Sequence, residues 1–190
     1  MKCVILAAGE GKRMMPLTAK TPKPLLEVCG FSLISYVLDN LPPDIDEVII
    51  VVKYLGDQIK KHVGNEWDGM KIKYVTGSDK GNAYSFLATE KYLKDERFLL
   101  MYGDEIPNPS DVEECLEKDL SILTFDGGIY NGVMVLNTDI FEHELTDGLF
   151  RTLVEEFVKD HKVSFIEARN FVGGINTPSD LARVEKELYG

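Results

Sequence analysis

Short apolar runs alternate along this chain with segments whose apolar residues recur every three or four positions, and this alternation restricts the fold more than any other feature. Residues 47–52, for example, are rich in valine and isoleucine, which is typical of a buried strand. Residues 32–41 carry apolar side chains at helical spacing, and Pro42 and Pro43 then stop the pattern. The pattern predicts strands at residues 2–6, 47–52, 71–75, 97–102, 120–125, 133–137 and 162–167, and helices at residues 32–41, 56–63, 82–93, 111–118, 149–159 and 179–188.

Strands that alternate with helices indicate parallel βαβ units, with helices on both faces of the sheet. We therefore predict an α/β fold, a three-layer α/β/α sandwich around a mostly parallel, Rossmann-like sheet. The 190 residues, of which 44% are hydrophobic, suit one domain that spans residues 1–190. Ligands of such sheets bind at the carboxyl ends of the strands, where conspicuous loops follow Leu6 and Tyr102.

The net charge of −11 argues against several classes of partner. With 21 basic and 32 acidic residues, the chain is a poor general binder of nucleic acid or of anionic membranes. Residues 1–25 differ from the rest, because they hold five basic residues against a single acid, Glu10. A cationic segment in an acidic protein indicates a small anionic ligand, such as a phosphate.

Compartment and redox state follow from simpler features. No apolar run reaches the ~18 residues that cross a bilayer, and the apolar start of the chain runs into a charged glycine loop rather than a signal-peptide cleavage site. We therefore expect a cytoplasmic protein. Cys3, Cys29 and Cys115 are widely spaced, which predicts reduced thiols. An oligomer is possible, and the sequence does not determine how many subunits it would contain.

The loop after the first predicted strand contains Gly9 and Gly11, followed by Lys12 and Arg13. Glycines let the backbone approach a ligand closely, and the amides of such loops attract phosphate. The loop is not a P-loop, because Arg13 stands where that motif needs serine or threonine. It is not a dinucleotide fingerprint either, because Met14 occupies the place of the third glycine. A glycine loop that continues as irregular, basic backbone is therefore predicted.

Residues 6–18 (LAAGEGKRMMPLT) and 20–25 (KTPKPL) resemble the signature of the sugar-1-phosphate nucleotidyltransferase family. The pattern is long and fixed in its spacing, and the likeness extends loosely over most of the chain. In that family the backbone of the loop holds the base and the phosphates of a nucleoside triphosphate. By resemblance these nucleotide-binding roles fall on Leu6, Ala7, Ala8, Gly9 and Gly11.

The same resemblance assigns cationic groups. It implies that Arg13 contacts the triphosphate and that Lys23, between Pro22 and Pro24, contacts phosphate groups, so these two are the candidate catalytic residues. Lys12 stands at a variable position of the motif and is a weaker candidate for nucleotide binding.

The resemblance also implies a Mg²⁺ site. The pair Gly103-Asp104 follows a predicted strand, and in the family the aspartate at this place binds the metal; Mg²⁺ prefers one or two carboxylates together with water and substrate phosphates. A second ligand is expected just before the last helix, where two alignments select Gly174 or Asn176. We choose Asn176, because glycine has no side chain. Glu105 is expected to point elsewhere.

Residues 81–83 (Gly-Asn-Ala) resemble a Gly-Thr-Ala segment that lines the nucleobase pocket in the family, with Asn82 in place of the threonine. Gly81 and Asn82 are therefore candidates for base contacts, while an N-cap of the following helix is an equally good role for Asn82. The Tyr-Ser pair that follows is similar to the choline-phosphate cytidylyltransferase branch.

The resemblance breaks at residues 119–137. The family has a longer excursion here, with a Glu-Lys-Pro motif that helps to hold the sugar phosphate, and this chain has neither. Asp126, Tyr130, Asn131 and Gly132 are the candidates for binding the acceptor instead. The nucleotide half of the site is therefore expected to be intact and the acceptor half reduced.

The predicted reaction transfers a nucleoside monophosphate from a nucleoside triphosphate to a small phosphomonoester, a sugar-1-phosphate by resemblance, with release of pyrophosphate. One alternative is a cytidylyltransferase for a choline- or inositol-phosphate type of acceptor. Another is a regulatory module that binds nucleotide without catalysis. A glycosyltransferase ranks last, because Gly103-Asp104-Glu105 lacks the Asp-x-Asp metal motif.

Overall fold

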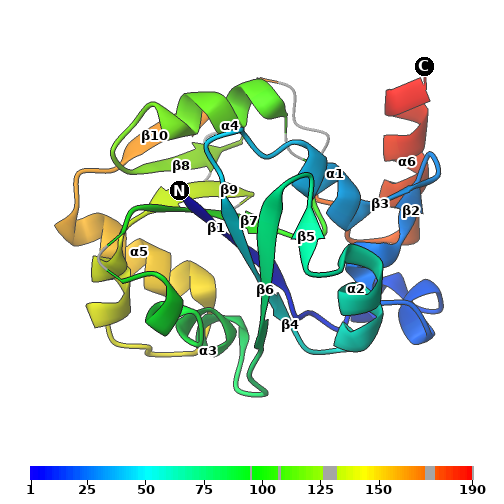
Figure 1. The fold of residues 1–190 in the computed structure, drawn as a ribbon, viewed down its shortest axis with the longest axis horizontal. Coiled ribbons are helices and arrows are strands. Elements are labelled where there is room, and N and C mark those ends of the chain that lie inside the picture. Colours follow the sequence, from blue (N-terminus) through cyan, green and yellow to red (C-terminus); the bar gives the residue numbers. More distant parts are fainter. Residues whose placement is uncertain (95, 107, 126–131, 170–173, 190) are drawn as a thin grey trace.

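The computed structural model describes residues 1–94, 96–106, 108–125, 132–169 and 174–189. Within this part of the chain, eight strands form one sheet in the order β10-β8-β9-β7-β1-β4-β6-β5 (Figure 1). Parallel pairing joins the four central strands, which are β7 (Phe98–Tyr102), β1 (Lys2–Ala7), β4 (Glu47–Val52) and β6 (Met70–Thr76). The mostly parallel α/β sheet that the sequence predicts is thus confirmed.

The ends of the sheet bring in antiparallel strands. β9 (Val133–Leu136) runs antiparallel to both β7 and β8 (Ser121–Thr124), while β10 (Ser164–Glu167) pairs parallel with β8. At the other end β5 (Glu66–Trp67) pairs antiparallel with β6. A separate hairpin of β2 (Glu27–Val28) and β3 (Phe31–Ser32) lies beside the last helix (Figure 1).

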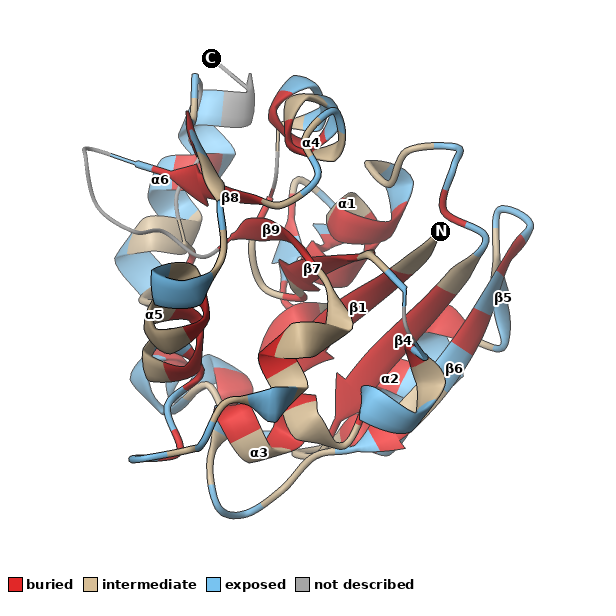
Figure 2. Cartoon of the chain, turned by 90° about the vertical axis from the view of Figure 1, so that its left-hand side faces the viewer, coloured by how far each residue is buried: buried red, intermediate tan, exposed pale blue. Residues whose placement is uncertain are grey.

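Helices cover both faces of the sheet, and the alternation of side chains along β1 shows why. Ile5 points into one core layer and Leu6 into the other. The first layer lies under α1 (Leu33–Asp39), α2 (Gly56–Val63) and α4 (Pro109–Leu116), and the second lies under α3 (Asn82–Leu87) and α5 (Phe150–Asp160). Both faces of a strand such as β1 are therefore buried, as its continuous apolar run predicts (Figure 2).

A third apolar cluster attaches the N-terminal segment to the end of the chain. Three short 3₁₀ helices, η1 (Lys12–Met14), η2 (Leu17–Ala19) and η3 (Lys23–Leu25), follow the glycine loop. Met14 packs with Ile175 and with Val184 of α6 (Pro178–Tyr189), and all three are fully buried. This cluster holds the loop after β1 and the segment before α6 on the same side of the sheet.

One predicted helix is wrong in its extent. Residues 82–93 form the short helix α3 and then the 3₁₀ turn η4 (Glu90–Tyr92) instead of one continuous helix. The hydroxyl of buried Thr89 donates a hydrogen bond of 2.7 Å to the carbonyl of Phe86, and a side chain bonded to the backbone in this way competes with helical bonding. Gly81, not Asn82, is the N-terminal flanking residue of α3.

The other predicted elements are confirmed, with bounds that differ by a residue or two. Among the described residues, no helix combines the length and the hydrophobicity that a membrane span requires. Cys3, Cys29 and Cys115 are free cysteines in this structure.

Candidate active site

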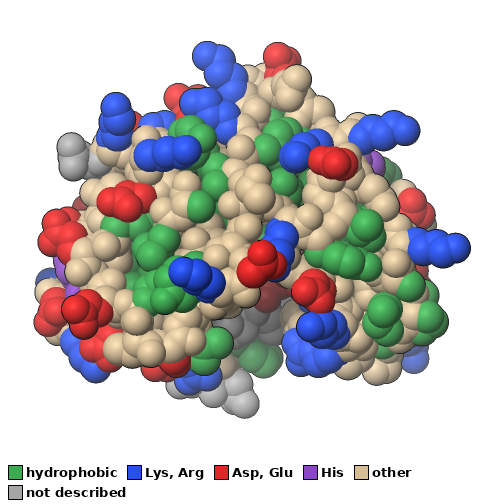
Figure 3. Space-filling model, turned by 90° about the horizontal axis from the view of Figure 1, so that it is seen from below, with side chains coloured by type: hydrophobic (Ala, Val, Ile, Leu, Met, Phe, Trp, Pro, Cys, Tyr) green, Lys and Arg blue, Asp and Glu red, His purple; other side chains and the backbone are tan. Residues whose placement is uncertain are grey.

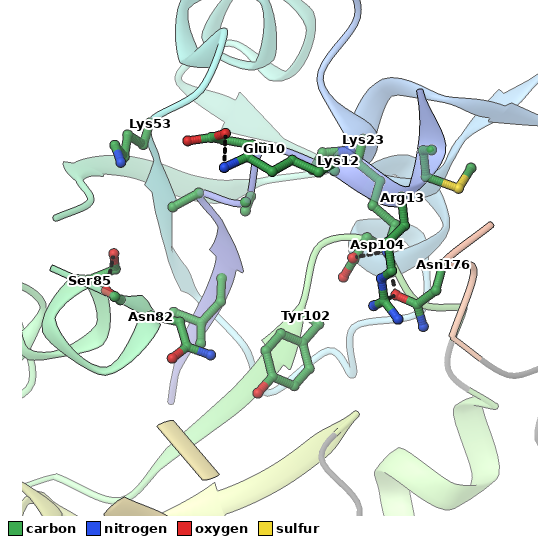
Figure 4. A pocket seen from close by; sticks show the side chains of 18 of the residues that line it. Glu10, Lys12, Arg13, Lys23, Lys53, Asn82, Ser85, Tyr102, Asp104 and Asn176 are labelled. Carbon is green, nitrogen blue, oxygen red and sulfur yellow. Dashed lines mark hydrogen bonds and ion pairs between the residues drawn. The ribbon is translucent and has the colours of Figure 1, made fainter. Parts of the chain in front are cut away.

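A pocket of about 510 Å³ opens at the carboxyl ends of the central strands. Its walls come from the loop after β1, from η3, from the loop after β6, from the start of α3, from the end of β7 and from the segment before α6 (Figure 4). It lies where a ligand site is expected in an open α/β sheet. On the face seen in Figure 3, basic and acidic side chains are interspersed.

The glycine loop has one tight position and one open position. Gly11 adopts a φ of +63°, and a Cβ added there would lie 2.9 Å from Cγ2 of Thr18 and 3.2 Å from Cβ of Lys23. The hydroxyl of Thr18 also donates a hydrogen bond of 2.8 Å to the carbonyl of Gly11. By contrast, no atom lies within 4 Å of a Cβ added at Gly9. The loop is thus fixed against η2 and η3 at Gly11 and open at Gly9.

Lys23 is the centre of the polar network. Its side chain is only 9% exposed, and its ammonium contacts Oδ2 of Asp104 and lies 3.1 Å from Oδ1 of Asn176. Oδ1 of Asn176 also accepts a hydrogen bond of 2.9 Å from Nη2 of Arg13 (Figure 4). Four of the predicted site residues, drawn from three distant parts of the sequence, therefore meet in one cluster.

Asn176 is held in place by the start of α6. One carboxylate oxygen of Asp180 accepts hydrogen bonds from the backbone N–H groups of Asn176 (2.9 Å) and Thr177 (2.7 Å). Desolvation opposes the charged form of Asp180, but these bonds, the hydroxyl of Thr177 and nearby Arg183 together lower its pKa below the usual value. The ionised carboxylate therefore organises the segment that presents Asn176.

Asp104 and Asn176 also fit the expected Mg²⁺ site. Both supply hard oxygen atoms, and a single cation, the ammonium of Lys23, contacts an oxygen of each. Between the two candidates before α6, only Asn176 has a side chain in the pocket, since Gly174 instead pairs through its backbone with Glu105. No group of three or more His, Cys, Asp or Glu side chains is arranged for a metal among the described residues. A metal held here would thus need further ligands from substrate phosphates or water.

The opposite end of the pocket is formed by the start of α3. Gly81 has a φ of +132°, and a Cβ there would meet the carbonyl oxygen of Gly148 at 2.7 Å. The hydroxyl of Ser85 accepts a hydrogen bond of 2.9 Å from the N–H of Ser78 and donates one of 3.0 Å to the carbonyl of Gly81. These bonds shape the loop after β6 around the pocket.

Tyr102 is a pocket residue that the sequence reasoning did not select. It lies in Figure 4 between Asn82 and Asp104, at the end of β7. Burial, together with the charges of Glu105 and Asp104, raises the pKa of its phenol, so the hydroxyl stays protonated at neutral pH. Its position directly before the Gly103-Asp104 pair is the sequence signal that identifies it as a pocket residue. Lys53 and Ser78 also line the pocket, and no motif points to them, whereas Ser85 belongs to the Tyr-Ser pair described above.

The remaining nucleotide-binding candidates of the first strand and loop, Leu6, Ala7, Ala8 and Lys12, all line the pocket. Lys12 is exposed and forms an ion pair of 3.1 Å with Glu10. Of the acceptor-binding candidates, Asp126, Tyr130 and Asn131 lie outside the described residues. Gly132 is buried directly before β9 and is not among the residues that line the pocket.

Fold and site together define a Rossmann-like α/β protein with a polar pocket at the carboxyl ends of its central strands. The family model described as nucleotidyl transferase matches residues 2–121. The chain therefore belongs to the nucleotidyl transferase family.

Curated relatives carry related names. The chain is 37% identical over 129 residues to the UTP–glucose-1-phosphate uridylyltransferase of Haloferax volcanii, covering 66% of this chain and 53% of that protein. It is 33% identical over 117 residues to a CMP-5'-(3-aminopropyl)phosphonate synthase of Streptomyces rubellomurinus, covering 60% of this chain and 18% of that protein. The chain spans about half the length of the first curated relatives it matches.

A third relative matches nearly the whole of this chain but is longer than it. The chain is 26% identical to a Bacillus subtilis protein named as a glucose-1-phosphate cytidylyltransferase, over 98% of this chain and 95% of that protein. That alignment extends over 244 positions, so the relative has segments that this chain of 190 residues lacks.

Solved structures share the fold. A nucleotidyl transferase from Methanothermobacter thermautotroptrophicus superposes with a TM-score of 0.81 at 22% identity, covering 99% of this chain and 97% of that chain. The inositol-1-phosphate CTP transferase of T. maritima superposes with a TM-score of 0.78 at 20% identity, covering 97% and 96%.

Proposed function

We propose that this protein transfers a nucleoside monophosphate from a nucleoside triphosphate to a sugar-1-phosphate and releases pyrophosphate. The observation that carries the proposal is the cluster of Arg13, Lys23, Asp104 and Asn176 beside the glycine loop. Membership of the nucleotidyl transferase family and the sugar-phosphate names of the relatives support it.

In the proposed reaction a phosphate oxygen of the acceptor attacks the α-phosphorus of the triphosphate. A new P–O bond forms, the bond between the α-phosphorus and the bridging oxygen breaks, and its electron pair leaves with pyrophosphate. No protein nucleophile is needed. Arg13 and Lys23 position the phosphates and stabilise the negative charge that develops on them, a contribution that a preorganised site makes strongly.

Mg²⁺ is the proposed cofactor, with Asp104 and Asn176 as its protein ligands. When bound, it would supply charge neutralisation of the phosphate oxygens. The ammonium of Lys23 contacts an oxygen of each of these two side chains, so a cation of the protein itself holds them together.

We also propose that the enzyme is cytoplasmic and that its substrates are small molecules only. Its net charge of −11 disfavours nucleic acid and anionic membranes as partners.

The test is pyrophosphate release from a matrix of nucleoside triphosphates and phosphomonoesters, with Mg²⁺ or with a chelator. We expect release with at least one sugar-1-phosphate, and a loss of about a hundredfold or more in Asp104→Ala and Asp104→Asn. Asp57→Ala removes a carboxylate that is 97% exposed and lies outside the pocket, and it should retain full activity. Normal Mg²⁺-dependent turnover by both Asp104 variants would refute the metal assignment.

A non-sugar acceptor is the second candidate. The relative named as a CMP-aminopropylphosphonate synthase and the missing Glu-Lys-Pro segment both favour it. Release with choline-, inositol- or phosphonate-type acceptors, and not with sugar phosphates, would select this candidate. Tight nucleotide binding without release for any acceptor would instead identify a regulatory module.

A further inference from the structure

The chain between the glycine loop and Lys23 is largely exposed. Within residues 15–20, all of which the structure describes, Thr18 is buried and the other five are exposed. Met15 and Leu17 are apolar side chains that are nevertheless 56% and 42% exposed. A segment with few buried apolar contacts opens easily unless hydrogen bonds hold it. The position of this segment therefore depends on its hydrogen bonds to the rest of the fold.

Those hydrogen bonds come from the turn after β4 and from α2. The hydroxyl of Tyr54 donates a hydrogen bond of 2.9 Å to the carbonyl of Thr18, and its oxygen lies 3.3 Å from the carbonyl oxygen of Ala19. Nε2 of Gln58, in α2, donates a hydrogen bond of 2.9 Å to the carbonyl of Lys20. Three consecutive carbonyls are therefore held from one side, by two side chains that do not line the pocket.

Thr18 connects this restraint to the glycine loop. Its side chain is fully buried, and its hydroxyl donates a hydrogen bond of 2.8 Å to the carbonyl of Gly11. That carbonyl also accepts a hydrogen bond of 2.8 Å from the N–H of Met14, so both of its acceptor positions are used. In a planar trans peptide the N–H points opposite to the carbonyl. The N–H of Lys12, a pocket residue, is thus directed away from Thr18.

We propose that Tyr54 is a positioning residue of the active site. Through Thr18, its hydroxyl holds the glycine loop in the conformation that receives the phosphates of a nucleoside triphosphate, and Tyr54 itself does not touch the substrate. This inference rests on the proposed function. A Cβ added at Gly11 would lie 3.2 Å from Cβ of Lys23, so the loop that Thr18 holds is packed directly against η3. The same restraint therefore also sets where the loop lies relative to Lys23.

Tyr54→Phe removes only the hydroxyl. Tyr74→Phe is its matched control, because the hydroxyl of Tyr74 donates a hydrogen bond of 2.5 Å to the carbonyl of Gly64, and neither residue lines the pocket. Both variants are first treated with trypsin in the absence of nucleotide, and cleavage after Lys20 is followed. This cleavage should be about tenfold faster in Tyr54→Phe than in the wild type and unchanged in Tyr74→Phe. Because no ligand is present, this readout does not depend on the proposed function.

Equilibrium binding of CTP, UTP, GTP and ATP with Mg²⁺ is then measured by calorimetry, together with the melting temperature. Both tyrosine variants should lower the melting temperature by a similar amount, whereas only Tyr54→Phe should weaken triphosphate binding, by about tenfold. Thr18→Val removes the second hydroxyl of the same chain of bonds and should weaken binding to a similar degree. The double variant of Tyr54 and Thr18 should bind no more weakly than the weaker single variant, since both hydroxyls act through one path.

Each part of the proposal has its own contrary result. Triphosphate affinity that is unchanged in Tyr54→Phe, whether or not cleavage after Lys20 is faster, would overturn the positioning role. An equal loss of affinity in Tyr54→Phe and Tyr74→Phe would reduce that role to general stability. Losses that multiply in the double variant would overturn the path through Thr18. A wild type that binds none of the four triphosphates would refute the proposed function itself.

Discussion

At the scale of single residues, Lys23 has a demanding environment for a charged group. Its side chain is only 9% exposed, and a buried charge is tolerated only with close partners. Asp104 and Asn176 provide those partners. The contacts that compensate the buried charge of Lys23 also place it beside both candidate metal ligands. Replacing Lys23 would therefore remove its structural role and its chemical role together.

The roles of the two glycines of the loop, Gly9 and Gly11, can be tested separately by substitution, and this gives a paired prediction. Gly11→Ala forces a side chain into a left-handed backbone and against Thr18, and we expect a loss of about 1–3 kcal/mol of unfolding free energy. Gly9→Ala meets no neighbouring atom, so its stability should be unchanged, while triphosphate affinity falls because a methyl group enters the open side of the loop. Urea unfolding and nucleotide titration check both. Equal stabilities of the two variants would contradict the assignment.

At the scale of elements, the start of α6 works as a reciprocal cap. The carboxylate of Asp180 accepts a hydrogen bond of 2.7 Å from the backbone N–H of Thr177. In return, the backbone N–H of Asp180 donates a hydrogen bond of 3.3 Å to the hydroxyl of Thr177. Met14, Ile175 and Val184 pack beneath this turn. The position of Asn176 in the pocket is therefore a property of the helix start and not of Asn176 alone.

This arrangement predicts a dependence on pH. Asp180→Asn should lower the unfolding free energy at pH 7 by about 0.5–2 kcal/mol, the range for losing a helix cap. The folded state lowers the pKa of Asp180, so its contribution is full above the ordinary aspartate pKa of about 3.9 and is lost as the pH falls through the lower folded-state value. The difference between variant and wild type should hence begin to shrink as the pH falls below about 3.9 and disappear below the folded-state pKa of Asp180. A difference that stays constant as the pH falls, with no decline below about 3.9, would contradict this account.

Element types were largely predictable from the sequence, because buried strands and amphipathic helices differ in their apolar periodicity. The break after α3 was not, since it depends on a bond from the hydroxyl of Thr89 that periodicity does not register. In the site, the resemblance of the loop pointed to Arg13 and Lys23, and the separate Gly103-Asp104 match pointed to Asp104; the structure brings the three into one pocket. The hydrogen bond of 2.9 Å that Oδ1 of Asn82 accepts from the N–H of Phe150 could not be predicted, because only the folded chain brings α5 near Asn82.

At the scale of the whole molecule, the pocket connects segments that are distant in sequence. A ligand that spans them binds only the folded state and stabilises it. At a hundred times its Kd, a triphosphate should add about 2.7 kcal/mol, which for a chain of 190 residues raises Tm by about 5–10 °C. Thermal unfolding with Mg²⁺ and nucleotide checks this, with the corresponding nucleoside as the control. An unchanged Tm at saturating triphosphate would count against a pocket built across the fold.

The hydrogen bond between Arg13 and Asn176 has a consequence for the order of events during translation. The two residues are 163 positions apart, so the glycine loop leaves the ribosome long before Asn176 does. A nascent chain that has not reached residue 176 has the glycine loop and its basic residues, but it has no amide oxygen for Arg13 and Lys23 to share. Synthesis from N- to C-terminus thus delays completion of the pocket until the sheet has been built.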